Sequence, residues 1–547
     1  MNLENKIDFS GTTYSVVDPN IYEVYKQTGD GELFEKLVSD LILNKYSDDP
    51  DINKYINSLG KKDQRLAIMS LIDKETKGDS NLLWSEMKSY VESAIDKTEH
   101  IKDVVRIINK FVKDGTVEKK KHGEVMTPIT LVREMLDTLP KEVWSNPNLK
   151  WLDPANGAGT FPFVIIYKLM NGLKDWEPDT EKRYKHIVEN MIYVCELQSR
   201  NVFLWLCGVD PKDEYTTNTY WGSFLEEGFD KHMREVWKVD KFDIVVGNPP
   251  YQEMDGTGGN GSSAKPIYNL FIDKLSLISE NILFIIPSRW MAGGKGLDIF
   301  REKMMSQKKV KFIKDIFNSS EIFPGTEISG GVCYFLWCNK HNGSCEFNGY
   351  IRDLSQYDII VRDNMSINIL EKVINKSKSY YDSRVFPQKP FGMRSNYNNW
   401  VNDGIPTVTR EGIKMANSID VSDRFNIISK YKVLISKADG ASFNSGRIVS
   451  KYIISNPGEA CLETYLVCGV FDTKNEAINA GNYLMSKFSR FMLSLRLISQ
   501  NNSSDKFKWV PDMGNYNICY KDEYLFTYFN LNESEIDFIN QKIKNIF

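Results

Sequence analysis

The residues with the clearest chemical potential are Asn248, Pro249, Pro250 and Tyr251, which directly follow the apolar run FDIVVG. Two consecutive prolines at the end of a strand form a stiff turn, because each ring fixes φ. Such a turn would hold the Asn248 amide and its own carbonyl groups pointing away from the strand. These oxygens can accept two hydrogen bonds from a planar amino group, and the Tyr251 ring offers a flat face for stacking. The pattern predicts a site for an amino group carried by a base or an amide.

A second pattern, DPANGAGTF at 153–161, follows the run KWL. Gly157 and Gly159 would let the backbone approach a ligand closely before a helix begins, although a G-x-G pair is also typical of an ordinary tight turn. Glu196 ends the next apolar run, where a carboxylate can hold ribose hydroxyls or simply face solvent. Gly159 and Glu196 are 37 positions apart (196 minus 159). That separation exceeds the ~20 residues of a dinucleotide fold and argues against NAD as the ligand.

Both motifs lie in a stretch of alternating apolar strands and helices, which is typical of a mostly parallel, doubly wound α/β sheet. The periodicity before it, from 20 to 112, is helical. Short strands and turns follow from about 380. The chain therefore divides into a helical N-terminal region (1–115), an α/β domain (116–380) and a C-terminal α+β domain (381–547). The expected parallel strands are LKWLDPA, MIYVCEL, FDIVVGN, NILFIIP and VKFIKDIFN, and SSEIFPG, GGVCYFLWCNK and SCEFNGYI are expected to form an antiparallel edge.

Composition and charge limit the class of protein. The chain has 547 residues, 41% of them hydrophobic, and a net charge of −4, so any contact with nucleic acid has to be local. Such a local excess occurs at 381–520, with 17 basic against 12 acidic residues. The first residues, MNLENKIDFS, do not resemble a signal peptide, and the apolar runs are far shorter than the ~20 residues of a membrane span. We therefore expect a cytoplasmic protein without a membrane partner.

Four potential metal ligands lie close together in the sequence: Cys333, Cys338, His341 and Cys345. The stretch VCYFLWC reads as a strand, in which an odd separation places Cys333 and Cys338 on opposite faces. The eight cysteines form no regular framework and fit a reducing compartment. We expect no metal.

The motif series as a whole resembles that of the S-adenosylmethionine-dependent adenine-N6 DNA methyltransferases. The order, with cofactor motifs before NPPY and a recognition domain last, is similar to their γ class. The resemblance implies a Rossmann-like methyltransferase domain followed by a target-recognition domain. The implied activity is site-specific methylation of an adenine flipped out of double-stranded DNA, for restriction-modification or epigenetic marking. The matching segments are GEVMTP, DPANGAGTF, VCEL, GSFLE, FDIVVGNPPY, IYNLFIDKLS and FIIPSRW, and more loosely FGMRSNYNNW and the run from ETYLVCGVF to FKWVPD.

The resemblance also implies a role for each matching residue. For the cofactor, S-adenosylmethionine, it implies Thr127 and Pro128 at the methionine end, Asp153, Ala155 and Gly157 around the amino and carboxylate groups, Glu196 at the ribose, and Leu197, Ser223 and Phe271 at the adenine ring. The family often has an acid at the position of Ser223, whereas a serine accepts the same hydrogen bond without a charge.

Catalysis would belong to the NPPY residues. Asn248 and the Pro249 carbonyl would accept the two N6–H bonds, and Tyr251 would stack on the flipped base. Phe323 would pack on the base from the other side, or else belong to the core. Basic residues that would contact DNA, each of which could equally be an ordinary solvated charge, are Arg394, Lys437, Arg447 and Lys451.

Alternative functions stay open on the sequence alone. An RNA or protein methyltransferase can also use NPPY, although such chains are about half as long. A bifunctional restriction enzyme would need a nuclease motif, and the N-terminal region offers only scattered pairs such as Glu118 with Lys120. A DNA-binding subunit without activity would not need an intact NPPY. The N-terminal helices could support the catalytic domain, contact DNA or bind a partner, and the oligomeric state is not predicted.

Overall fold

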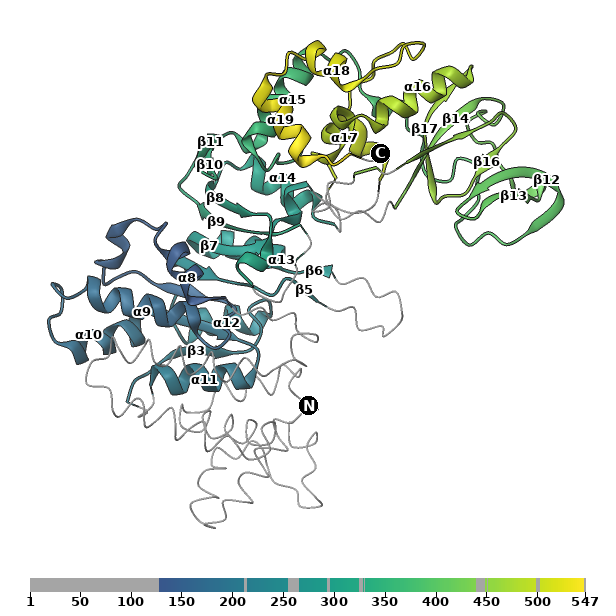
Figure 1. Cartoon of the computed structure of the whole chain (residues 1–547). Coiled ribbons are helices and arrows are strands. Elements are labelled where there is room, and N and C mark those ends of the chain that lie inside the picture. Colours follow the sequence, from purple (N-terminus) through teal and green to yellow (C-terminus); the bar gives the residue numbers. More distant parts are fainter. Residues whose placement is uncertain are drawn as a thin grey trace, which may run out of the picture. The chain divides into compact units, whose positions relative to one another are not determined.

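The computed structural model divides into two compact units (Figure 1). Unit 1 comprises the described residues up to Ser288 and from 296 to Leu354, and unit 2 comprises 289–292 and the described residues from Ser355 onward. The expected helical region 1–115 and Arg447 lie outside the described residues. The structure describes residues 127–210, 214–253, 265–292, 296–323, 328, 330–438, 448–449, 451–497 and 502–545.

Unit 1 is built on a nine-stranded sheet in the order β11-β10-β8-β9-β7-β4-β1-β2-β3. The strands from β7 to β3 in this order are parallel, which confirms the large, mostly parallel sheet expected from the apolar runs. The strands are β1 (Trp151–Asp153), β2 (Ile192–Glu196), β3 (Asn218–Trp221), β4 (Phe242–Gly247), β7 (Ser279–Pro287), β8 (Val310–Ile316), β9 (Val332–Cys338), β10 (Cys345–Phe347) and β11 (Tyr350–Arg352).

The prediction of an antiparallel edge is wrong for the stretch GGVCYFLWCNK. This stretch forms β9, which lies inside the sheet and pairs antiparallel with β7 on one side and β8 on the other. All its residues from Val332 to Trp337 are buried, because an entirely apolar strand is stable where both faces are covered. The described part of SSEIFPG forms a 3₁₀ helix (Ser319–Glu321) rather than a strand. At the edge, β10 pairs parallel with β8, and only β11 is antiparallel to its neighbour.

Helices cover both faces of this sheet, as expected for a doubly wound fold. On one face, Val194 of β2 belongs to a core that includes residues of the helices at 129–136, 160–172 and 199–209. The preceding residue, Tyr193, points to the opposite face, where it contacts the rings of Trp237 and Phe242. Phe229, in the helix at 227–235, packs on Trp237. The helices of unit 1 are α8 (Ile129–Leu136), α9 (Thr160–Gly172), α10 (Thr180–His186), α11 (Ser199–Val209), α12 (Glu227–Glu235), α13 (Tyr268–Ile278) and α14 (Asp298–Ser306).

Unit 2 is of the α+β kind, with two three-stranded sheets in the orders β13-β12-β16 and β15-β14-β17. No helix among the described residues of either unit is long and apolar enough to cross a membrane. The elements of unit 2 are α15 (Asn364–Lys376), β12 (Trp400–Thr409), β13 (Gly412–Ala416), β14 (Tyr431–Ser436), β15 (Tyr452–Ser455), β16 (Ala460–Cys461), β17 (Tyr465–Phe471), α16 (Lys474–Met485), α17 (Lys487–Ser494), α18 (Asp522–Tyr528) and α19 (Glu533–Lys542).

The division by contacts begins unit 2 earlier than the expected domain boundary near 380. The reason is the amphipathic helix α15, whose apolar side chains pack into the same core as α16 and α17. Residues 289–292 join unit 2 because Ala292 lies in that core and the Ile360 N–H donates to the Met291 carbonyl at 2.8 Å. The functional extents of the three regions stay predictions.

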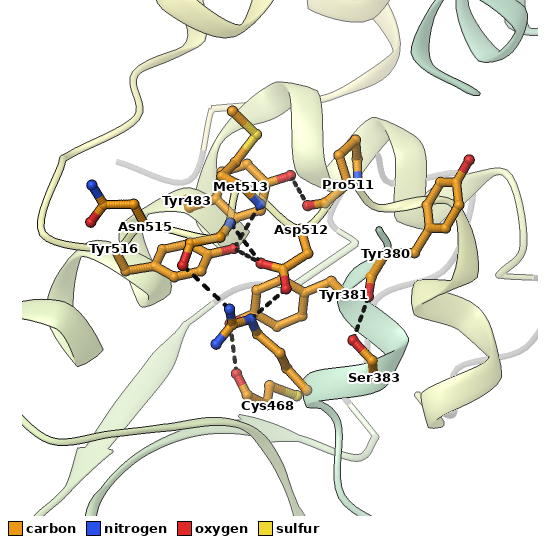
Figure 2. Close-up of polar contacts among 12 residues, drawn as sticks. Tyr380, Tyr381, Ser383, Cys468, Tyr483, Pro511, Asp512, Met513, Asn515 and Tyr516 are labelled. Atoms are coloured by element: carbon orange, nitrogen blue, oxygen red, sulfur yellow. Dashed lines mark hydrogen bonds and ion pairs between the residues drawn. The ribbon is translucent and has the colours of Figure 1, made fainter. Parts of the chain in front are cut away.

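A polar network fixes the VPD segment of unit 2 at 510–512 (Figure 2). Arg384 Nε donates to Asp512 Oδ2 at 2.7 Å, and the Tyr516 hydroxyl donates to Asp512 Oδ1 at 3.1 Å. The Tyr483 hydroxyl donates to the Pro511 carbonyl at 2.6 Å. The two bonds to the Asp512 carboxylate are charge-assisted and therefore stronger than neutral ones, so they hold this segment in its place within unit 2.

Candidate active site

The two predicted motifs meet where the strand order of the sheet reverses. β2 and β3 lie on one side of β1, and β4 and β7 lie on the other. Parallel α/β sheets bind ligands beyond the carboxyl ends of the strands at such a point. Asp153 ends β1, and Gly247 ends β4 directly before Asn248. A side-chain carbon at Gly247 would lie only 2.8 Å from Asp153 Oδ1, so the two turns are immediate neighbours.

The turn after β1 is held by Glu196, at the end of β2. Glu196 Oε2 accepts from the Gly157 N–H and Oε1 accepts from the Gln198 N–H, each at 2.7 Å. Glu196 is only 7% exposed, which is not the setting of a surface carboxylate. Gly159 has φ of +95°, and a side chain there would collide with the Phe163 and Trp205 rings. Gly157 has φ of +55° and open space around the position of a side chain, which leaves room for a ligand.

Asp153 is a buried acid beside this space. Burial raises the pKa of its carboxyl from the usual value to about 8, the Ala155 N–H opposes that shift, and the charge of Glu196 adds to it. Among the described residues, Asp153 Oδ2 and the Asn156 Oδ1 atom of the same turn have no hydrogen-bond partner. The sequence analysis missed Asn156, although its place within DPANG could have indicated it. Buried acceptors of this kind are suited to bind a cationic or hydrogen-bond-donating ligand.

Replacement of Asp153 by asparagine is expected to stabilise the ligand-free protein. Below about pH 4 the carboxyl is protonated in the folded and unfolded states alike. Between about pH 4 and its folded pKa of about 8, only the unfolded chain releases the proton, so stability falls as the pH rises through this window and then levels off. The thermal midpoint of Asp153→Asn should therefore exceed that of the wild type at pH 7 to 8, and the difference should shrink towards pH 4.

The measurement is a pH series of thermal midpoints by scanning fluorimetry. Asp240→Asn, at an exposed position of unit 1, is the matched control and should follow the wild type. Parallel profiles for Asp153→Asn and the wild type would show that Asp153 titrates as an ordinary acid.

The NPPY turn after β4 contacts a residue that lies 121 positions earlier in the chain. Asn248 Nδ2 donates to Thr127 Oγ1 at 3.0 Å, and Thr127, just before α8, is only 6% exposed. Burial raises the pKa of the Tyr251 hydroxyl above its usual value, and the Asn248 amide opposes that shift. The hydroxyl lies near this amide but makes no hydrogen bond of standard geometry to the described residues. Pro249 is buried, and Pro128 and Pro250 are half-buried. The structure thus brings Thr127 and the NPPY turn together.

The residues expected at an adenine ring lie at the ends of β2 and β3 and on α13. The Gly222 N–H donates to the Glu196 carbonyl at 2.9 Å, which places Ser223 just beyond the paired strand ends. Leu197 is 49% exposed. Phe271 is buried, and its ring stacks on Phe224 with centroids 5.3 Å apart. One face of Phe271 is therefore covered by protein.

The remaining predicted site residues, Phe323 and the basic residues of unit 2, do not belong to the two motif turns. Phe323 is 3% exposed and belongs to the core of unit 1, which favours its structural interpretation. In unit 2, Arg394 and Lys451 are exposed, and Lys437 Nζ donates to Gln388 Oε1 at 3.0 Å. Within the described ranges, no three His, Cys, Asp or Glu side chains gather as they would around a metal ion.

Parts of this chain are similar to known methylases. Residues 177–323 match the Eco57I restriction-modification methylase family. That range includes Glu196 and the NPPY turn, but not Asp153. Residues 177–323 therefore resemble a methylase region of the restriction-modification type.

Individual relatives are distant. An uncharacterized adenine-specific methylase of Mycoplasma pneumoniae is 28% identical over 326 residues, which cover 47% of this chain and 76% of that protein. The modification methylase CviBIII of Paramecium bursaria Chlorella virus NC1A is 27% identical over 199 residues, covering 35% of this chain and 44% of the viral protein. The solved DrdV–DNA complex has a TM-score of 0.47 at 11% identity, covering 98% of this chain and 68% of that one.

Proposed function

We propose that this chain is a site-specific adenine-N6 DNA methyltransferase of the γ class, which uses S-adenosylmethionine and acts on an adenine flipped out of double-stranded DNA. The observation that carries the proposal is the meeting of the two motifs: NPPY follows β4 next to the DPANG turn after β1, at the reversal of strand order. The matched family and the adenine-specific relative support the same chemistry. The order of the motifs along the chain supports the γ class.

The residues around the first turn fit this cofactor. Asp153 Oδ2 is a buried acceptor that would receive the cofactor's amino group, and the open space at Gly157 would admit its methionine part. Glu196, already aligned by two backbone N–H groups, would hold the ribose, with Leu197, Ser223 and Phe271 at the adenine ring. Thr127, Pro128 and Ala155 would line the methionine end. When bound, S-adenosylmethionine supplies a methyl group activated by its sulfonium.

The NPPY turn would prepare the target nitrogen for attack. The adenine N6 is a poor nucleophile because its lone pair is delocalised into the ring. Hydrogen bonds from its two N–H groups to the Asn248 side chain and the Pro249 carbonyl would favour a pyramidal nitrogen with a directed lone pair, which is catalysis by orientation and electrostatics. Pro250 stiffens the turn, and no general base is needed before transfer. Flipping costs a few kcal/mol, which stacking on Tyr251 offsets by about 1 to 3 kcal/mol.

The test is methylation of a genome. The full chain is expressed in a host without adenine methylation, and the genomic DNA is sequenced by a method that detects N6-methyladenine. We expect modified adenines in one sequence context and none with Asn248→Ala. In parallel, tritiated methyl transfer is measured on unmodified DNA, RNA and protein. Transfer to RNA or protein but not to DNA would overturn the proposal in favour of the alternative methyltransferases.

We further propose that unit 2 selects the DNA sequence. Specific recognition needs side chains at base edges together with basic groups at phosphates. Arg394, Lys437 and Lys451 supply such groups in unit 2; Arg447, which the proposal also includes, lies outside the described residues. Lys437 is held rigidly, because its N–H donates to the Thr464 carbonyl and its carbonyl accepts from the Asn502 N–H, both at 2.8 Å.

Alanine at Arg394, Lys437 or Lys451 is expected to weaken DNA binding without changing cofactor affinity. A lost phosphate contact lowers affinity for all sequences and reduces the salt dependence, whereas a lost base contact costs about 1 to 3 kcal/mol at one position of the target only. Fluorescence anisotropy with target and random duplexes at several salt concentrations separates the two outcomes. Lys474→Ala, at an exposed lysine of α16, is the control. Unchanged binding in all three variants would contradict this assignment of residues.

A further inference from the structure

One buried contact joins the cofactor side of the site to the target side. The Asn248 amide donates through Nδ2 to the Thr127 hydroxyl at 3.0 Å, across 121 positions of the chain. Thr127 is buried, so this bond is shielded from competition with water. The resemblance places Thr127 at the methionine end of the cofactor. That role does not explain why the Thr127 hydroxyl contacts the Asn248 amide, which would face the target base.

The contact matters because an asparagine side chain can present either of two chemically opposite groups. The oxygen accepts hydrogen bonds and the NH₂ group donates them, and rotation about the last side-chain torsion exchanges the two. The prolines after Asn248 fix the backbone of the turn but not this rotation. An adenine amino group is a donor, so only the orientation with the oxygen towards the base is productive.

We propose that Thr127 is a positioning residue for the target base. Its hydroxyl accepts from Nδ2 and thereby holds the Asn248 amide with the oxygen towards the adenine amino group. The inference rests on the proposed function and deepens it: Thr127 sets the preference for a base that carries an amino group over one that carries an oxygen at the same position.

The test compares Thr127→Val, which keeps the shape and removes the hydroxyl, with Thr127→Ser, which keeps the hydroxyl. At saturating cofactor and DNA, Thr127→Val should lower kcat by about 3- to 10-fold, the effect of one neutral hydrogen bond. Thr127→Ser should recover most of that loss. The dissociation constant of S-adenosylmethionine, measured by calorimetry, should stay within a few-fold of wild type in both variants.

A second readout reports the amide orientation itself. The dissociation constant is measured for duplexes that carry adenine or hypoxanthine at the target position. Hypoxanthine has an oxygen where adenine has its amino group, so it can be bound there but not methylated. The wild-type enzyme should prefer adenine, and Thr127→Val should reduce that preference about 3- to 10-fold because the bond from Asn248 Nδ2 to the Thr127 hydroxyl is lost. Thr127→Ser should restore it. Comparing each variant with the wild type on the same two duplexes cancels the different ease of flipping the two bases.

The matched control is Thr219→Val. Thr219 Oγ1 also accepts one buried N–H, from Trp205 Nε1 at 3.0 Å, but it lies within β3, away from NPPY. This variant should lose a similar amount of thermal stability and keep wild-type kcat and base preference. If Thr127→Val fails to fold, Thr127→Ala gives the same comparison.

Unchanged kcat and base preference in Thr127→Val would overturn the inference. Weakened cofactor binding with wild-type kcat at saturation would also overturn it, because Thr127 would then act on the cofactor alone. Failure of the proposed function gives a different result, since the wild-type chain itself would not methylate adenine in DNA.

Discussion

Asn248→Ala is expected to abolish methyl transfer to DNA while leaving the affinity for S-adenosylmethionine within a few-fold of wild type. The variant removes the side-chain oxygen that would accept an N6–H bond, and the loss of one oriented acceptor in a closed site costs about 10²- to 10³-fold in rate. Asn248 donates to Thr127, whereas backbone N–H groups hold the Asp153 and Glu196 carboxylates, so the cofactor side is expected to keep its geometry. Single-turnover methylation and calorimetry measure the two effects separately.

Asn248→Asp is the informative comparison, because it keeps an oxygen acceptor and has almost the same volume. We expect its activity to lie between those of alanine and wild type. Loss of cofactor binding in a folded Asn248→Ala protein would show that the amide belongs to the cofactor site, and the assignment of NPPY to the target would fall.

Tyr251 is expected to act through its ring and not its hydroxyl. Tyr251→Phe should retain most activity, because the buried hydroxyl has no hydrogen bond to the described residues and its removal leaves no partner unpaired. Tyr251→Ala removes the stacking face, which is worth about 1 to 3 kcal/mol, and should lower productive binding roughly 5- to 150-fold.

A 2-aminopurine at the target position separates binding from flipping, since its fluorescence rises when it leaves the stack. Stacking on Tyr251 can quench the signal again, so Tyr251→Ala should be brighter than Tyr251→Phe at equal occupancy. Equal loss of activity in the two variants would assign the function to the hydroxyl and reopen the search for another substrate.

Much of the fold is legible in the sequence because local patterns determine it. The runs that end at Asp153, Glu196 and Gly247 are short, apolar and followed by turn residues, and all three form parallel strands. The place of β9 was not predictable in the same way. Its composition indicates a buried strand, but insertion between β7 and β8 is a long-range pairing that no local pattern encodes.

The site follows the same division. The motif spacing identifies Asp153, Glu196 and Asn248 as chemically important, whereas the raised pKa of Asp153 depends on burial that only the packed sheet creates. The contact between Asn248 and Thr127 joins residues far apart in the chain, so their convergence emerges only on folding. The contacts divide the chain at 355 instead of near 380 for a similar reason, because the apolar face of α15 has the same periodicity whichever core receives it. The functional boundary near 380 stays a prediction.

The assignment of residues 289–292 to unit 2 limits how natural recombination could exchange recognition specificity among related chains. A single crossover at Ser355 would give a hybrid whose unit 2 still contains Met291 and Ala292 from the old parent. Those residues supply the carbonyl that receives the Ile360 N–H and part of the apolar core. A viable chimera must therefore take residues 289–292 and the chain from Ser355 onward from one parent, or keep 289–292 compatible with the new unit 2. We expect chains that acquired a new specificity to show two linked recombination breakpoints rather than one.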